Sequence, residues 1–327
     1  MNLCSSQWTP KNMNPKFRAV LSGLSTYLPW RDSKGATGGT DSARYCYSVW
    51  LRHLILGARH GPPTKIPTVV AELGPGDSIG IGLAALLSGA DKYFALDLIR
   101  YSDLQKNLEI FDALVAMFES EMPVPGESEF PFLYPKLDRY DFPEQLLSED
   151  WLRKSLAPAR LAAIRSSIEQ SDAEGSMVSY KAPWIAPDVI ETASVNLIFS
   201  QAVLEHVDGL AGVYAAMRKW LKPEGIMTHQ IDFRCHGKAR AWNGHWTYSD
   251  SLWKIVVGRR LYLLNRQPHS VHVNLIKQNG FEILEDATLR ADSILRRKDL
   301  SPQFRTLSDG DLTTSGAFIV AAIARAA

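Results

Sequence analysis

The sequence predicts an α/β protein with a mostly parallel sheet. Short, largely apolar runs alternate along the chain with longer segments whose apolar residues recur at helical spacing. Runs of this kind are typical of strands that are covered by helices on both faces. The three clearest runs are at 69–71, 92–97 and 194–200.

Composition and charge fit a cytoplasmic globular protein. The 327 residues are 46% hydrophobic and 22% charged, enough for one large core or two modest ones. A net charge of +1 gives no overall field to attract nucleic acid or an anionic membrane. The three cysteines form no C-x-x-C pair, so we expect neither a disulfide framework nor a metal site. Residues 1–17 lack the apolar run of a signal peptide, and no stretch is long enough to span a membrane.

Before the first strand, one loop and one helix are expected. Residues 1–40 are rich in Ser, Pro, Gly and Thr, and 31–39 predicts a flexible loop. A helix is expected over 41–56, with Asp41 or Ser42 as its N-cap.

The first strand, at 69–71, is followed by an apolar helical segment at 79–87, and the second strand, at 92–97, by an insertion of roughly 80 residues. Helical periodicity over 101–118 and 143–170, on either side of a proline-rich loop over 121–143, predicts that the insertion is helical. The later elements are expected in this order: strands at 177–180 and 195–199, a helix at 210–220, a strand at 225–233, a helix at 270–279 closed by Gly280, and strands at 281–285 and 316–324.

The turn after the first strand predicts a cofactor site. Glu72 ends the strand, and Gly74 and Gly76 allow a tight turn that a ligand can approach closely. Strand, glycine turn and helix in this order are typical of nucleotide-cofactor sites. The dinucleotide fingerprint G-x-G-x-x-G would need a glycine at the position of Ile79, which disfavours NAD.

Glu72-Leu-Gly74-Pro-Gly76 resembles the first motif of class I S-adenosylmethionine (SAM)-dependent methyltransferases, with Ser78 at the place of the third glycine. The stretches 202–207 (Ala-Val-Leu-Glu-His-Val) and 221–225 (Leu-Lys-Pro-Glu-Gly) resemble later motifs of the same family, of the methyltransferase type 11 kind. The resemblance implies a Rossmann-like sheet of seven strands with an antiparallel edge, flanked by helices.

The same resemblance implies a SAM site. Asp97 ends the second strand about 25 residues after Glu72, where a carboxylate can accept both ribose hydroxyls. After the third strand the family often has an acidic residue for the adenine amino group, but this chain has Lys181, which cannot accept that bond. The cofactor-binding residues that we expect are Glu72, Gly74, Pro75, Gly76, Asp77, Asp97, Leu98 and Ser200.

The expected elements and the resemblance together predict the domain organisation. Residues 1–65 are expected to form an N-terminal loop and a cap helix, and 66–327 the methyltransferase domain. The helix at 41–56 either covers the cofactor, as the resemblance implies, or packs on the sheet edge. The insertion, at about 101–174, is expected to be a lid over the acceptor pocket, with a static cap or a partner surface as alternatives.

Catalytic candidates follow the fourth and fifth strands, because ligands in open α/β sheets lie beyond the carboxyl ends of the strands. We expect His236, oriented by Asp232, to take a proton from an acceptor hydroxyl, with His206 as the next candidate. The alternatives are an ordinary polar loop for the pair and a packing role beside the cofactor for His206. His229, deeper in the fifth strand, is expected to be structural. The other polar candidates are Glu205, Arg234 and His245.

The aromatic-rich segment 242–253 fits either a sugar ring or a packed core. Arg259, Arg260, Asn265 and Arg266 after it are donors that could meet an anionic group. Together with a likeness of 229–236 to methyltransferases of bacterial polysaccharide clusters, this segment favours an O-methyltransferase of a sugar, glycan precursor or other small molecule.

The alternatives are an N- or C-methyltransferase of a small metabolite, or an inactive SAM-binding partner subunit. A nucleic-acid substrate is disfavoured, because Ser200-Gln-Ala-Val stands where DNA amino-methyltransferases carry Asn/Asp-Pro-Pro-Tyr/Phe, and no Pro-Cys pair occurs.

Overall fold

The computed structural model describes residues 13–29, 39–60, 66–184 and 186–325. The flexible loop expected at 31–39 lies outside these residues except for Gly39. Among the described helices, none has both the length and the apolar character needed to cross a membrane.

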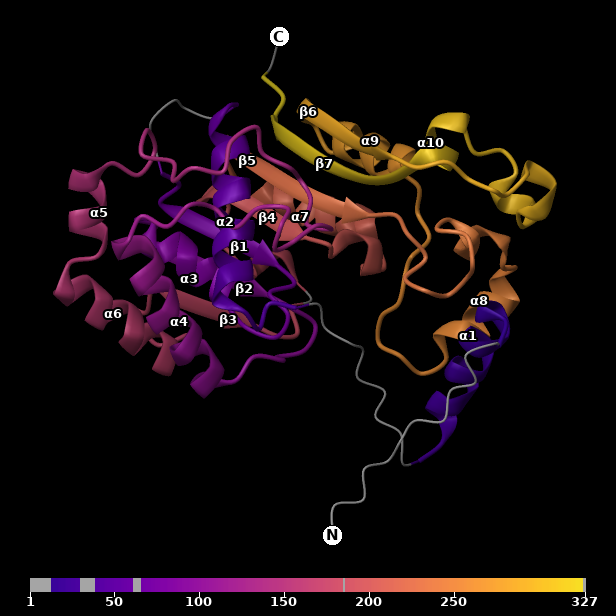
Figure 1. Cartoon of the computed structure of the whole chain (residues 1–327), viewed down its shortest axis with the longest axis horizontal. Coiled ribbons are helices and arrows are strands. Elements are labelled where there is room, and N and C mark those ends of the chain that lie inside the picture. The colour runs from indigo at the N-terminus through magenta and orange to yellow at the C-terminus, as the bar shows by residue number, and fades with distance from the viewer. Residues whose placement is uncertain (1–12, 30–38, 61–65, 185, 326–327) are drawn as a thin grey trace.

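A seven-stranded, mostly parallel sheet organises the molecule (Figure 1), in the order β3-β2-β1-β4-β5-β7-β6. β7 is antiparallel to both of its neighbours, β5 and β6, and the other pairs are parallel. The predicted Rossmann-like fold, with its antiparallel edge, is therefore confirmed. The strands are β1 (Val69–Leu73), β2 (Lys92–Leu96), β3 (Val178–Lys181), β4 (Val195–Gln201), β5 (Leu221–Asp232), β6 (Phe281–Arg290) and β7 (Thr314–Ile323).

Helices cover the two faces of the sheet and bury a separate apolar cluster on each. Alternate strand residues supply the two clusters: Val70 of β1 belongs to one and Ala71 to the other. α2, α3 and α4 pack in the first cluster, and α7 and α9 in the second. The helices of eight residues or more are α1 (Pro15–Leu24), α2 (Ala43–Ala58), α3 (Gly80–Leu87), α4 (Leu104–Glu119), α6 (Pro158–Glu169), α7 (Leu210–Trp220), α8 (Asp250–Val257) and α9 (His269–Gln278), and the shorter ones are α5 (Glu149–Ser155) and α10 (Asp309–Thr313).

The expected helix at 41–56 is α2, and Ser42 is its N-cap, accepting a hydrogen bond from the Tyr45 N–H at 3.4 Å. α2 lies against α3, α4 and β5 on a face of the sheet, not at its edge. Trp50 in its middle is fully buried and donates to Ser88 Oγ at 2.7 Å. The helix thus belongs to the core of the sheet domain.

The insertion is helical, as predicted, and thickens the helical layer on that same face. Its second helical pattern divides into α5 and α6, because Pro158 starts a new helix at its N1 position. Ile110, Phe111, Leu114 and Phe118 of α4 are buried in the core, and α5 and α6 pack on α3. Every residue from 101 to 174 is described, so its position relative to the site can be stated below.

Three of the described helices were not predicted: α1, α8 and the short α10. α1 and α8 lie side by side (Figure 1). The expected N-terminal loop is wrong over 15–24: the Asn14 side chain caps α1 by accepting from the Lys16 N–H at 3.0 Å, and Pro15 stands at N1. Gly23 allows the close approach, since a Cβ there would lie 1.9 Å from the Ile255 carbonyl oxygen.

Candidate functional site

A cavity of about 540 Å³ opens beyond the carboxyl ends of β1, β2 and β4. This is where ligands bind in open α/β sheets, and the volume lies in the range of small-molecule sites. One end is formed by the glycine turn and the residues after β2. The other end is formed by residues after β4 and β5 and by the segment 260–264.

The glycine turn is shaped for close approach by a ligand. Gly74 and Gly76 line the cavity with φ of +65° and +74°, a conformation that favours glycine. A Cβ on Gly74 would lie 2.7 Å from the side chain of Val203. No larger residue fits there without displacing the cavity wall.

Thr40, just before α2, holds this turn in place. Its hydroxyl donates to the Pro75 carbonyl at 2.8 Å and accepts from the Ser78 N–H at 3.2 Å. The Ser78 hydroxyl donates in turn to the Thr40 carbonyl and accepts from the Gly80 N–H at 3.1 Å. The serine that replaces the third glycine of the motif therefore anchors the turn to the chain before α2.

Glu72 lies beneath the turn and does not line the cavity, so its predicted contact with a cofactor is not supported. It is 1% exposed, and the Tyr93 hydroxyl donates to its Oε2 at 2.5 Å. Burial raises the pKa of Glu72 to about 8. The carboxyl group supports the turn from inside the sheet.

Asp97 reaches the cavity from the next strand, as predicted. Its Oδ1 accepts from the Leu98 N–H at 2.7 Å, while burial raises its pKa and the backbone N–H groups of Leu98, Ile99 and Gly76 oppose that rise. Leu98 lines the cavity beside it, and so do the aromatic rings of Tyr101 and Trp184. This end combines one carboxylate with flat apolar walls.

Other predicted cofactor residues lie outside the cavity lining. Ser200 is fully buried, and its hydroxyl is bonded to His229 Nδ1 at 2.8 Å. Pro75 and Asp77 belong to the turn, but they do not line the cavity. Lys181, at the expected adenine position, is paired with Asp172 at 2.8 Å. His229 is structural, as expected, and burial lowers its pKa to about 3.

The other end of the cavity carries the predicted catalytic histidines. His206 and His236 both line it, with ring centroids 5.2 Å apart. Burial, and after it the charge of His236, lowers the pKa of His206 to about 4. Asp232 Oδ2 lies 3.3 Å from His236 Nε2, so the expected pair is present.

Arg234 shares the carboxylate of Asp232. Its Nε donates to Oδ1 at 2.8 Å, and its Nη2 to Oδ2 at 2.6 Å. Burial alone would raise the pKa of Asp232, but the bonds from His236 and Arg234 outweigh it and hold that pKa well below its usual range. Asp232 is therefore a fixed anion behind His236.

Glu205, one residue before His206, is buried behind the two histidines. It is 3% exposed, and within the described ranges neither carboxylate oxygen has a hydrogen-bond partner. Burial raises its pKa well above the usual value, and the nearby backbone N–H groups of Glu205 and Asp232 oppose that rise only in part. A buried polar side chain without partners requires an explanation.

Sequence analysis missed several residues of the cavity: Trp184, Val203, Lys238 and Tyr262. Tyr262 and Tyr101 are joined through their hydroxyl groups at 3.0 Å, which links the segment 260–264 to the residues after β2. The sequence did contain a signal for Lys238, because this residue follows the fifth strand by a few positions, as the other polar candidates do. No local pattern marks Tyr262, which reaches the site only through the packing of α8 and α1.

Of the four donors expected after the aromatic segment, only Arg260 lines the cavity, and the Arg259 guanidinium lies over the ring of Tyr27, 5.0 Å from its centroid. Arg260 lines the cavity and donates to the Ser22 hydroxyl of α1 at 2.7 Å. Arg266 is buried against Asp250, and Asn265 bonds the turn at 204–207. Within 242–253 no residue lines the cavity, and Trp246, Tyr248 and Trp253 are buried. The aromatic segment is packed core.

The insertion does not cover this cavity. Of its residues, all of them described, only Tyr101 contributes to the lining. The lining therefore gives no support to a lid at 101–174. The segment 260–264 contributes Arg260, Tyr262, Leu263 and Leu264 to the wall instead. The insertion leaves the sheet after Asp97 but turns onto the face covered by α2 and α3.

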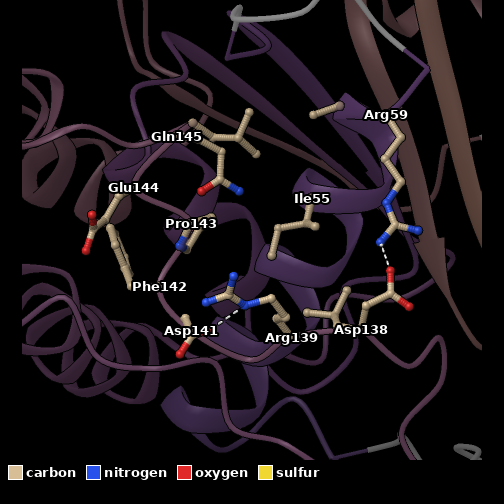
Figure 2. A pocket seen from close by; sticks show the side chains of 12 residues that line it. Ile55, Arg59, Asp138, Arg139, Asp141, Phe142, Pro143, Glu144 and Gln145 are labelled. Carbon is tan, nitrogen blue, oxygen red and sulfur yellow. Dashed lines mark hydrogen bonds and ion pairs between the residues drawn. The ribbon is translucent and has the colours of Figure 1, made fainter.

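A second hollow, of about 590 Å³, lies between the end of α2 and the loop at 137–146 (Figure 2). Four of its five charged side chains are paired with each other: Arg59 with Asp138 at 2.6 Å and Arg139 with Asp141 at 2.9 Å. It is not at the carboxyl ends of the strands. We therefore place the functional site in the cavity at the glycine turn.

No protein-family model and no curated protein matches this sequence. Solved structures do match. A chain of phosphoethanolamine N-methyltransferase 2 from Haemonchus contortus, in complex with SAM, is 14% identical with a TM-score of 0.42, over 97% of this chain and 62% of that chain. A SAM-dependent methyltransferase from Mesorhizobium loti is 13% identical with a TM-score of 0.37, over 82% and 96%. Likeness at this level says nothing about the reaction of this chain, so a function has to be supported by the cavity itself.

Proposed function

We propose that this chain is a SAM-dependent methyltransferase that acts on a small-molecule acceptor. When bound, SAM supplies a methyl group on a sulfonium, which a nucleophile can accept directly. The observation that carries the proposal is the convergence of the glycine turn and the Asp97 carboxylate on one cavity, from adjacent parallel strands.

The residues at that end fit this cofactor. The Asp97 carboxylate can accept from the two hydroxyls of a ribose, and the positive φ of Gly74 and Gly76 leaves backbone exposed to a methionine chain. Leu98 and Trp184 offer apolar faces for a planar base. The turn itself, from Gly74 to Ser78, carries no basic side chain, which suits a cofactor without phosphate.

The acceptor end is lined by His206, His236, Lys238 and Arg260. These side chains suit an acceptor with a hydroxyl group and a negative charge, so we propose O-methylation. Sugars and glycan precursors remain within the proposed class, but the aromatic segment no longer favours them, because it is packed core. A proton acceptor role for His236, oriented by Asp232, remains part of this proposal.

Binding calorimetry with S-adenosylhomocysteine, the demethylated product, tests the proposal. Asp97→Asn keeps the shape of the side chain but removes the charged acceptor, which is worth about 1.5–3 kcal/mol, or roughly 10- to 150-fold in affinity. Asp91→Asn is the matched control, because Asp91 lies just before the amino end of the same strand. Equal affinity in the Asp97 and Asp91 variants, or tighter binding of NAD, would contradict the proposal.

A further inference from the structure

We propose that Glu205, His206 and His236 bind a divalent transition-metal cation at the wall of the cavity. Each side chain offers one ligand atom, and these atoms lie within 4.8 Å of one another. Two imidazoles and one carboxylate form a set that Zn²⁺, Fe²⁺ and Mn²⁺ accept, with coordination positions left open. This site was not expected from the sequence, since its ligands follow two different strands.

Unpartnered buried atoms are the strongest support for the site. Both oxygens of Glu205 and Nδ1 of His206 are buried and make no hydrogen bond to any described residue. Glu205 is only 3% exposed, and burying a carboxylate without a partner is strongly unfavourable. A proton on Glu205 would remove its charge but leave His206 Nδ1 unpartnered. One cation, taking one ligand atom from each side chain, would give Glu205 and His206 a shared partner.

The surrounding structure fixes the first two ligands. The Asn265 side chain donates to the carbonyls of Leu204 and Val207, at 2.7 and 2.9 Å. The Asn265 N–H donates to the Glu205 carbonyl at 2.7 Å. The short helical turn that carries Glu205 and His206 is therefore held at three points by one residue.

Asp232 and Arg234 hold the third ligand, His236, in place. Asp232 Oδ2 lies 3.3 Å from His236 Nε2, and Arg234 fixes the carboxylate. A carboxylate behind a histidine is the usual outer support of a metal-binding imidazole. His236 has a φ of +45°, a conformation that is strained for a residue with a side chain. Backbone strain of this kind is retained where a side chain must be aimed.

The open positions of the cation would face the acceptor. His206 and His236 line the cavity, while Glu205 lies behind them, so the free side of the cation points to the acceptor end. An acceptor oxygen is then the further ligand, and this part alone rests on the proposed function. With the cation bound, His236 is a metal ligand, and this role replaces the proton-acceptor role that the proposed function gives it.

Metal binding is tested on the full chain without a histidine tag, stripped by a chelator and dialysed into metal-free buffer. Calorimetric titration with ZnCl₂ and with MnCl₂, and elemental analysis after gel filtration, should show one equivalent of metal bound. Glu205→Gln and His206→Asn should each weaken binding by at least about 100-fold. The control is His60→Asn, which alters a partly exposed His–Glu pair, 2.7 Å from Glu285, and should bind metal normally.

The same variants separate this site from the proposed cofactor site. Glu205→Gln should keep its affinity for S-adenosylhomocysteine, and without metal it should melt no lower than the unaltered chain, because it removes an unpaired buried carboxylate. If it does not fold, His206→Asn decides. A chain that binds no metal, or variants that bind it as well as the control, would overturn the inference, whereas loss of S-adenosylhomocysteine binding alone would not.

Discussion

At the scale of single residues, the carboxylates of the site have different tasks. Asp97 faces the cavity, Glu72 is buried under the glycine turn, and Asp232 is fixed behind His236. Sequence analysis placed all three at strand ends, because a carboxylate after an apolar run is visible locally. It could not tell which of them faces the cavity, since a shift of one residue turns a strand side chain to the other face.

Glu72 should make stability depend on pH. Its pKa is about 8 in the folded chain against an ordinary value of 4.5, so between these values the folded state holds a proton that the unfolded state has lost. Its contribution is complete below the lower value and is lost as the pH rises through the higher one. Urea denaturation without cofactor, from about pH 5 to about pH 8.5, should show the unfolding free energy falling more steeply in the unaltered chain than in Glu72→Gln. Parallel pH profiles would contradict this assignment.

His236→Ala should separate the two ends of the cavity. Once an acceptor is found, kcat should fall by roughly 10²–10⁴, whether His236 takes a proton or holds a cation. Affinity for S-adenosylhomocysteine should stay within about twofold, because His236 follows β5 and Asp97 follows β2, and β1 and β4 lie between these strands in the sheet. Asp232→Asn should reduce kcat less, since it only loosens the imidazole. Activity that survives in His236→Ala would move the chemistry to another group.

At the scale of elements, the sequence was most informative where a single segment decides its own structure. α2 and its Ser42 cap, the strand–turn–helix at 69–87 and the antiparallel edge were all predicted and found. α1 and α8 were missed, although Asn14-Pro15 is an ordinary helix start. Their contact depends on Gly23, and nothing local predicts that two segments more than 200 residues apart meet.

Gly74 in the glycine turn and Gly175 in the loop before β3 offer a matched pair of substitutions. Ala at Gly175 or at Gly74 adopts a positive φ at a cost of about 1–2 kcal/mol in stability. Gly175 has nothing within 4 Å of its added Cβ, whereas the Cβ at Gly74 meets Val203 at 2.7 Å. Gly74→Ala should therefore lose more stability in thermal melts and also most of its S-adenosylhomocysteine affinity, which Gly175→Ala should keep. Equal behaviour of the two variants would mean that close approach at the turn is unimportant.

At the scale of the whole molecule, α1 and α8 support the segment 260–264, which lines the cavity. Arg260 donates to Ser22 of α1, and the Arg259 N–H donates to Thr26 at 2.8 Å, so the segment 260–264 is tied to the N-terminal helix. The 101–174 insertion packs instead on the helical layer over one face of the sheet. Sequence analysis assigned a lid to the insertion because it follows Asp97 directly along the chain. In the structure only Tyr101 of the insertion lines the cavity, so nearness in sequence to Asp97 did not predict which segment lies at the cavity.

Hydrogen exchange should locate the moving part. When S-adenosylhomocysteine binds, exchange should slow at the turn around Gly74 and Gly76 and in the segment 258–264, whose side chains reach the cavity. Residues 104–169 of the insertion should change little, since none of them lines the cavity. Strong protection of 104–169, with none in 258–264, would restore the insertion as the lid.

A crystal structure of the full chain with S-adenosylhomocysteine tests the central claim most directly. We expect the ligand in the cavity at the carboxyl ends of β1, β2 and β4, with both ribose hydroxyls on the Asp97 carboxylate and the methionine part along Gly74 and Gly76. The sulfur should point to the end that carries His206 and His236. A ligand bound elsewhere, such as in the hollow beside Arg59, or a ribose that does not contact Asp97, would contradict the account.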